Sequence, residues 1–261
     1  MAKAINQRVN NTDIFVFGYN PQTNLVTYSR PFNAKEAESL AEGTNQVIAS
    51  QYADVTGLRK GLSANKDGEL YNMSTLKGIV ANRVLMERTK GEQWLPTIEE
   101  LIQLQKKGML SSEVLIDGGI ALYDGKNPDE KIAKSLMTTA GEKGYSTPVL
   151  ASFKSLGLTV GGKRYGVTPQ IISADGLVHG AKAQTLLDEN NFIKGDSGVR
   201  RLLWYGGLWL ADWDDDLDGF LDDCRVGRFT AVGSREKLEE EALGRVAPIR
   251  QSLDSIFEQC N

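Results

Sequence analysis

The side chains with the greatest potential for chemistry gather between residues 198 and 229. Seven residues of this stretch are aspartates, and three of the four tryptophans of the chain lie in it. Carboxylates can hold a metal ion or select a partner by charge, and aromatic side chains form contacts at low entropic cost. The stretch contains no asparagine, lysine, serine or proline. These features predict a binding surface at 198–229.

The aspartates match part of a calcium-binding loop. Asp214, Asp216 and Asp218 occupy positions 1, 3 and 5 of a helix-flanked calcium loop, and Gly219 occupies position 6. Position 12 of such a loop is a bidentate glutamate, but here it is Arg225. The flanking segments also have the pattern of strands. A solvated acidic loop is therefore favoured, and a calcium-binding module or a metal-dependent hydrolase is the alternative function.

Other motifs carry less chemistry. Residues 157–163 fit G-x-x-x-x-G-K, but Arg164 follows where a phosphate-binding loop needs serine or threonine, so a hairpin turn is favoured. His179 is the only histidine, which leaves zinc sites and serine-type triads without partners; it is expected at a helix start. Cys224 and Cys260 are expected as two thiols, with a disulfide left open. No catalytic residue, metal or cofactor is predicted.

The N-terminal elements that would support this surface are mainly helical. Residues 13–30 have the pattern of two strands. Asn33 is placed to cap a helix, a second helical run covers 44–58, and Thr97 is placed to cap another helix that ends at Gly108. Further helices are expected over 75–88, near 111–116 and from 127 to 141. We therefore expect a mainly helical region over residues 1–140, with a possible role as an assembly module.

The C-terminal elements are mixed. Residues 147–154 resemble a strand, 158–167 a hairpin that turns at Gly161-Gly162, and 180–190 an amphipathic helix. Three strands are expected between 201 and 232, separated by Gly206-Gly207 and the aspartate-rich loop. Ser234 is placed to cap a final helix. The predicted fold class is therefore α+β, with a second region over residues 141–261.

The stretch also resembles a known family. The sequences GVRRL at 198–202, GG-x-W-x-A-x-W at 206–213 and CRVGRF at 224–229 are similar to the variable region of target proteins of diversity-generating retroelements. The resemblance implies a C-type lectin-like fold for residues 141–261. It also implies a function: a hypervariable surface, diversified by the retroelement, that binds a variable ligand, for which a protein is expected. Such a display protein is not an enzyme.

The resemblance implies which side chains are displayed. In that family template adenines are copied promiscuously, so a diversified stretch loses the adenine-rich codons of asparagine and lysine, and 198–229 has neither residue. Trp209, Ala211, Trp213 and Leu217 are expected to belong to the scaffold, because they alternate with displayed positions as in a strand. The displayed, ligand-binding set is expected to be Leu203, Trp204, Tyr205, Leu208, Leu210, Asp212, Asp214, Asp215, Asp218, Phe220, Leu221, Asp222 and Asp223.

Composition limits the partners and the setting. The chain has 261 residues, 41% of them hydrophobic, which is enough for one large domain or two small ones. A net charge of −4 argues against a general nucleic-acid binder. No apolar run reaches the length of a membrane span, and the start of the chain lacks the pattern of a signal peptide. We expect a cytoplasmic protein or a component of a virion.

The four arginines that flank the aspartates are expected to balance their charge.

Overall fold

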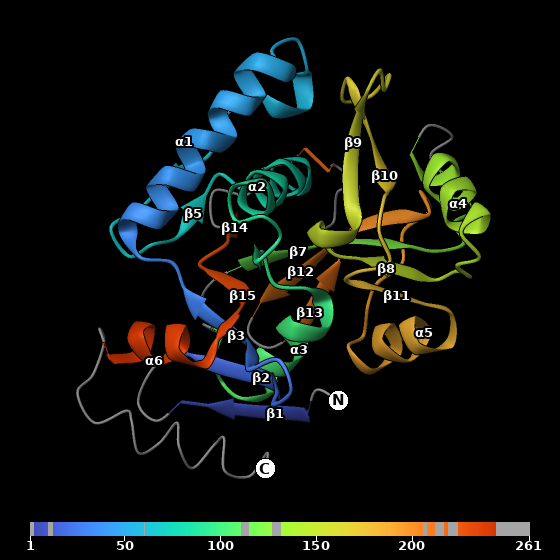
Figure 1. Cartoon of the computed structure of the whole chain (residues 1–261). Helices are drawn as coiled ribbons and strands as arrows, with labels where there is room; N and C mark the ends of the chain where they lie inside the picture. The colour runs from blue at the N-terminus through green and yellow to red at the C-terminus, as the bar shows by residue number, and fades with distance from the viewer. Residues whose placement is uncertain are drawn as a thin grey trace.

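Strands and helices are mixed throughout the chain. A computed structural model describes residues 3–9, 13–59, 61–110, 115–126, 132–205, 208–211, 217–218 and 224–243. Within these ranges it contains six α-helices and fifteen strands. The predicted α+β class is confirmed at this level. Figure 1 shows two larger sheets, with helices packed around them.

The first sheet joins segments from both ends of the chain. Its strands are β1 (Lys3–Arg8), β2 (Phe15–Asn20), β3 (Leu25–Pro31), β15 (Arg228–Ser234) and β6 (Gln93–Trp94), in that spatial order. β15 pairs antiparallel with β3 over its whole length, from Arg228 opposite Pro31 to Ser234 opposite Leu25. The end of the 198–229 stretch is thereby fixed to the predicted N-terminal strand pair, which the structure confirms.

The second sheet holds the beginning of the 198–229 stretch. Its strands, in spatial order, are β11 (Leu177–His179), β8 (Val149–Ala151), β7 (Leu115–Leu122), β12 (Val199–Tyr205) and β13 (Leu208–Ala211), and β14 (Cys224–Arg225) also pairs with β7. β7 is antiparallel to β8 and β12 and parallel to β14. The sheet therefore takes its central strand from the N-terminal half and most of its other strands from the C-terminal half.

Two smaller strand pairs complete the sheets. They are β4 (Ser63–Ala64) with β5 (Leu70–Tyr71), and β9 (Leu156–Val160) with β10 (Val167–Ile171). The β9–β10 hairpin projects from the body of the molecule (Figure 1). Its turn is longer than the predicted Gly161-Gly162 pair, because the backbone N–H of Gly161 donates to the carbonyl of Gly166 at 3.0 Å. The G-x-x-x-x-G-K motif is thus a hairpin, as predicted.

Three of the six described helices begin directly after a predicted capping residue. They are α1 (Ala34–Gln51), α2 (Thr75–Arg88), α3 (Ile98–Lys106), α4 (Ala133–Glu142), α5 (Gly180–Glu189) and α6 (Arg235–Leu243), with 3-10 turns at Thr56–Leu58 and Phe153–Ser155. Asn33 and Thr97 each accept from the backbone three residues on, and both complete a capping box. Ser234 accepts from the backbone N–H of Lys237 at 3.2 Å. No helix among the described residues is long and apolar enough to span a membrane.

One predicted helix break is absent. The helix capped by Asn33 and the run over 44–58 were predicted as two helices, but α1 continues without interruption to Gln51. A side-chain carbon at Gly43 would lie 1.8 Å from Nη2 of Arg88, at the end of α2. Gly43 therefore allows α1 and α2 to approach closely and does not end a helix. The second predicted run, 44–58, is helical over 44–51 as the last part of α1 and over 56–58 as a 3-10 turn.

The central strand β7 is the main element that sequence patterns miss. Leu115 and Ile116 were expected in a short helix, but they begin β7, and 111–114 lie outside the described residues. The sequence Asp117-Gly118-Gly119 interrupts the alternation that marks a strand. Gly119 has a φ of +124°, and a side-chain carbon there would lie 2.1 Å from the carbonyl oxygen of Ala151 on β8. The glycine is required by the close approach of the two strands.

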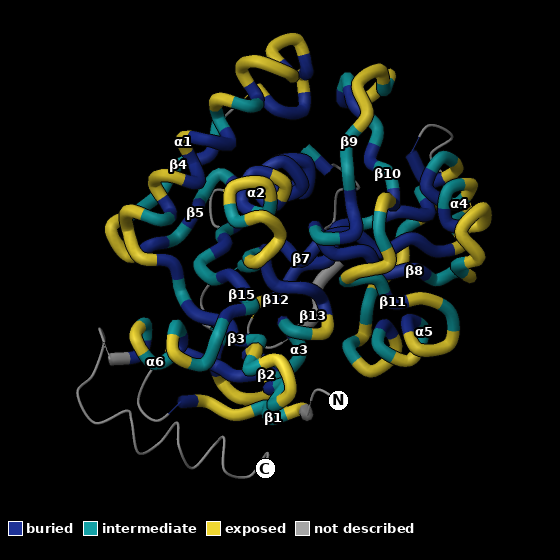
Figure 2. Tube along the Cα trace, in the orientation of Figure 1, coloured by how far each residue is buried: buried dark blue, intermediate teal, exposed yellow. Residues whose placement is uncertain are grey.

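The central part of the second sheet is buried on both faces. One face, which includes Leu203, packs against apolar side chains of α2 and α4; the other, which includes Leu202 and Trp204, packs against α3 and α5. Figure 2 shows β7, β8 and β12 in the interior. Both large sheets contain strands from each side of residue 140, which falls inside α4. The predicted border at 140 thus does not separate the sheets, and residues 1–140 contribute seven strands beside their helices.

Candidate binding surface

The strand β12 carries the first predicted display residues, and most of it is interior. Leu203 and Trp204 are each only 2% exposed. The prediction that these two side chains are displayed is wrong, because strand alternation exposes a side chain only when one face of the sheet meets water. The Leu203 side chain belongs to the apolar cluster that includes residues of α2, and the Trp204 side chain belongs to the cluster that includes residues of α3. Helices cover both faces.

Glycine at position 118 makes the burial of Trp204 possible. The pairing of β12 with β7 shifts register between Leu202 and Leu203, where Leu202 pairs with Gly119 and Leu203 with Asp117. A side-chain carbon at Gly118 would lie 2.2 Å from the ring carbon Cζ3 of Trp204. The indole therefore occupies space that any other residue at 118 would fill.

Exposure begins at the end of β12. Tyr205, the last residue of the strand, is 51% exposed, and Asp218 is partly exposed. β13 returns antiparallel along β12, with Tyr205 opposite Leu208 and Leu203 opposite Leu210. Among the described strands β13 pairs with β12 alone, so it is the outermost described strand on that side of the sheet. Among the members of the predicted display set whose side chains are described, these two reach solvent.

The remaining predicted positions can be placed only in part. Leu208 and Leu210, with the scaffold candidates Trp209 and Ala211, lie on β13, of which the backbone alone is described. The others lie outside the described residues: Asp212, Trp213, Asp214, Asp215, Phe220, Leu221, Asp222 and Asp223. Their expected roles stay predictions.

A buried ion pair connects β12 to the neighbouring strand β7. Arg201 donates to Oδ2 of Asp117 from Nη2 at 2.9 Å and from Nε at 3.2 Å, and both side chains are fully buried. The Thr75 hydroxyl donates to the same oxygen at 3.0 Å, and the Gly119 N–H donates to Oδ1 at 3.0 Å. Burial raises the pKa of Asp117, and Arg201 is the strongest influence opposing that rise. Nη2 of Arg201 also lies 3.6 Å from the Cys224 sulfur.

Sequence reasoning missed Asp117 and Thr75, although one signal was available. Asp117 is a lone carboxylate inside the apolar run VLIDGGIALY. A buried charge needs a partner, so such a position predicts a cation elsewhere in the chain. The partner, Arg201, lies 84 residues away. Local patterns could not identify it.

Leu217 is held in place by two distant elements. Its backbone N–H donates to the Tyr165 hydroxyl in the β9–β10 turn at 3.1 Å, and its carbonyl accepts from the N–H of Leu76, in the first turn of α2, at 3.1 Å. The Leu217 side chain is fully buried. Leu217 is thus interior, as expected of a scaffold residue, and these two hydrogen bonds hold its backbone at one point after β13.

The end of the stretch is fixed as firmly as its beginning. Val226 exchanges two backbone hydrogen bonds with Leu70, at 2.9 and 3.0 Å. Arg225 forms an ion pair with Glu69 at 2.8 Å. Arg201 and Arg225 were expected to balance the aspartates of the stretch, but their described ion-pair partners, Asp117 and Glu69, lie outside it.

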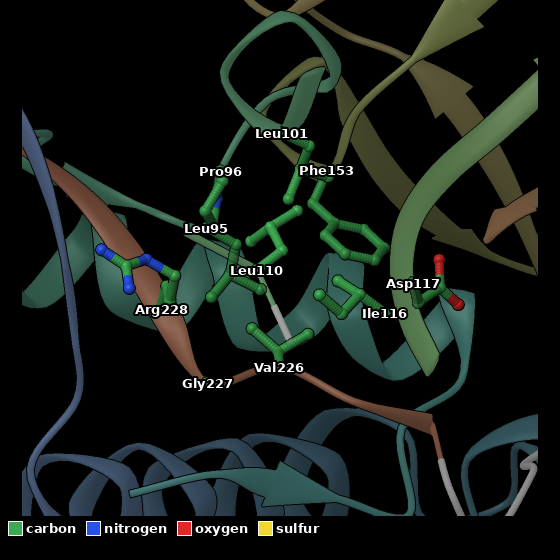
Figure 3. A pocket seen from close by; sticks show the side chains of 10 residues that line it. All are labelled: Leu95, Pro96, Leu101, Leu110, Ile116, Asp117, Phe153, Val226, Gly227 and Arg228. Atoms are coloured by element: carbon green, nitrogen blue, oxygen red, sulfur yellow. The ribbon is translucent and has the colours of Figure 1, made fainter. Parts of the chain in front are cut away.

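A small apolar space lies where the two large sheets meet. Figure 3 shows Leu95, Ile116, Phe153 and Val226 converging around it, with the carboxylate of Asp117 turned away. Its volume is about 20 Å³, on the scale of a single water molecule. The space is therefore a packing gap that leaves no room for an organic ligand.

The other predicted chemical residues have structural positions. His179 ends β11 and precedes α5, which confirms the expectation of a helix start. Cys224 is buried on β14, and Cys260 lies outside the described residues. Among the described residues no group of three histidine, cysteine or carboxylate side chains is placed to hold a metal ion. The calcium-loop positions 214 and 216 are not among them.

No family model, curated protein or solved structure matches this chain.

Proposed function

We propose that this chain is a non-enzymatic display protein with a C-type lectin-like domain, whose surface at 198–229 is diversified by a retroelement and binds a protein ligand. The observation that carries the proposal is a contrast within the stretch. Described positions that match the family motif are held by buried, backbone or ion-pair contacts. Of the residues between the first two motif segments, Leu203 and Trp204 are buried and Tyr205 is exposed, so the open part of the stretch begins at Tyr205.

The motif positions have structural requirements that explain why they would stay constant. Gly198 has a φ of +78°, and its carbonyl accepts from the backbone N–H of Tyr123 at 2.9 Å. Arg201 neutralises a buried carboxylate, and Cys224 and Phe229 are buried. A random substitution at any of these positions would remove a contact that the fold needs.

The chemistry of the open positions favours a protein ligand. Tyr205 combines a large apolar ring with a hydroxyl, which makes tyrosine frequent in antibody-like binding sites. Its strand partner Leu208 begins the edge strand β13, which leads into the aspartate-rich segment. An aromatic residue beside carboxylates suits a partner with apolar and basic side chains. The proposed set excludes Leu203 and Trp204, because both are buried.

Two matched libraries test the proposal. The first randomises five proposed display positions: Tyr205, Leu208, Leu210, Asp212 and Asp215. The second randomises five framework positions: Gly198, Arg201, Leu203, Trp204 and Cys224. Protease resistance on the surface of yeast measures folding, and selection against egg-white lysozyme measures binding. We expect most members of the first library to fold and some to bind, whereas most members of the second lose protease resistance.

The opposite library result would contradict the display surface. If both libraries lose folding to the same degree, 198–229 is an ordinary interior segment. The diversification part is tested separately in the neighbouring DNA. We expect a nearly identical repeat that differs almost only at adenines, beside a reverse transcriptase gene. A neighbourhood without that pair would contradict retroelement diversification and leave the binding result unaffected.

A further inference from the structure

A larger cavity lies between α2 and the β9–β10 hairpin. Its volume is about 400 Å³, and none of its lining residues belongs to 198–229. The floor consists of buried apolar side chains, among them Ile79 and Val80 of α2, Phe153 and Leu156. Cavities that bind small molecules have volumes of roughly 300–1,000 Å³ and mainly apolar walls. Size and lining therefore fit a small organic ligand.

Two glycines shape this cavity. Gly157 on β9 pairs with Gln170 on β10, and both line the cavity. A side-chain carbon at Gly157 would lie 3.0 Å from Cγ2 of Ile172, so a larger residue would enter the space at the mouth. A side-chain carbon at Gly78 would lie 2.4 Å from the ring of Phe153. Gly78 thus lets the ring of Phe153, which lines the cavity, pack closely against α2.

The charges at the rim cancel. Arg83 and Glu87, one turn apart on α2, form an ion pair at 2.7 Å. The Lys154 ammonium lies 3.5 Å from the centre of the Trp94 ring, and Asp175 supplies the second carboxylate. Two cations and two anions leave no net charge to attract an ion. Because burying an unpaired charge is costly, the cavity favours a neutral occupant.

One polar group at the wall is available to orient such an occupant. The Gln170 side chain is partly exposed, and it makes no hydrogen bond within the described part of the chain. Its amide can donate and accept. Ile172, 59% exposed, adds an apolar side chain at the mouth. We propose that this cavity binds a neutral, mainly apolar small molecule with a carbonyl or amide group that hydrogen-bonds to Gln170.

Two fluorescent probes with the same naphthalene body test the proposal on the full chain. Prodan is neutral and carries a ketone, whereas 1-anilinonaphthalene-8-sulfonate is an anion. We expect saturable, blue-shifted prodan fluorescence with one site per chain, and affinity for the anion at least several-fold weaker. Gly157→Leu should weaken prodan binding at least about tenfold by filling the cavity. Gln170→Leu should weaken it about two- to tenfold by removing one hydrogen bond.

A control at the tip of the same hairpin separates cavity binding from surface adhesion. Val160 is 62% exposed and does not line the cavity. Val160→Ser should leave prodan affinity unchanged, and an equal loss in this variant would overturn the proposal. So would unchanged affinity in Gly157→Leu, or tighter binding of the anion. Circular dichroism checks the fold of each variant. If Gly157→Leu does not fold, Ile172→Trp at the exposed mouth replaces it, with the same expected loss.

Discussion

Two adjacent aromatic residues of β12 have opposite environments. Trp204 is 2% exposed and lies against Gly118, whereas Tyr205 is 51% exposed at the end of the strand. The difference arises from what covers the sheet: helices pack on both faces along β12, and that cover ends at Tyr205. Two consecutive residues of one strand can therefore differ in role, one belonging to the buried framework and the next to the open surface. Their hydrophobicity alone does not distinguish the two roles.

The largest effect should come from breaking the ion pair beneath the covered part. Arg201→Leu leaves Asp117 buried without its cation, and removing one partner of a buried pair costs about 3–5 kcal/mol. Arg200→Leu is the matched control, because Arg200 is partly exposed and donates to the carbonyl of Ile193. We expect the control to cost about 1 kcal/mol or less. Denaturant unfolding measures both, and equal costs would show that the buried pair has no special role.

The loss of unfolding free energy caused by Arg201→Leu, called the deficit below, should also depend on pH. Burial raises the pKa of Asp117, and Arg201 opposes that shift. Without Arg201 the folded-state pKa rises further above the unfolded value. A carboxyl with a raised folded pKa is most stabilising below its unfolded pKa, and that stability is lost as pH rises through the folded pKa. We therefore expect the deficit to shrink as pH falls from about 7 to about 4. A deficit independent of pH would contradict a charged, unpaired Asp117.

The aromatic pair itself offers the most direct comparison. Trp204→Ala should lower the free energy of unfolding by about 3–5 kcal/mol, the range for a large aromatic residue removed from a core. Tyr205→Ala should change it by about 0.5 kcal/mol or less, as for an exposed residue. Leu203→Ser should resemble the tryptophan variant, with a cost of at least about 2 kcal/mol. Thermal denaturation decides: similar melting temperatures for the Trp204 and Tyr205 variants would remove the contrast.

A smaller effect is expected from one hydrogen bond to Asp117. Thr75→Val keeps the shape of the side chain and removes the hydroxyl that donates to Oδ2. The loss should be about 1–3 kcal/mol, because the acceptor is buried. Thr138→Val on the exposed face of α4 is the matched control and should cost about 0.5 kcal/mol or less. Urea unfolding of both variants measures the difference in stability loss. Equal losses would show that the Thr75 hydroxyl does not stabilise buried Asp117 and that Arg201 alone does so.

The smallest effect is expected from metal removal. If the aspartate-rich segment were a calcium site, calcium at 100 times its dissociation constant would add about 2.7 kcal/mol to stability. The proposed display surface requires no ion, so neither calcium nor a chelator should shift the melting temperature by more than about 1 °C. Differential scanning calorimetry with and without EDTA makes the measurement. A clear shift would favour the calcium-binding alternative.

Local features of this fold were predictable where neighbouring residues decide them. Asn33 and Thr97 cap their helices as predicted, and α2 spans 75–88 as predicted. The β9–β10 hairpin follows from its glycines. In each case the determining interactions lie within a few residues, so the sequence contains the whole physical cause.

The sequence by itself determined the α+β class, the helix starts after Asn33, Thr97 and Ser234, and the concentration of aromatic and acidic residues at 198–229. Only the tertiary structure decided that Leu203 and Trp204 are interior, that β7 is the central strand and that Arg201 meets Asp117. Each of these depends on contacts between segments far apart in the chain, such as the 84 residues that separate the ion pair. Burial is a property of what packs on a residue, and the order of amino acids around it does not record that.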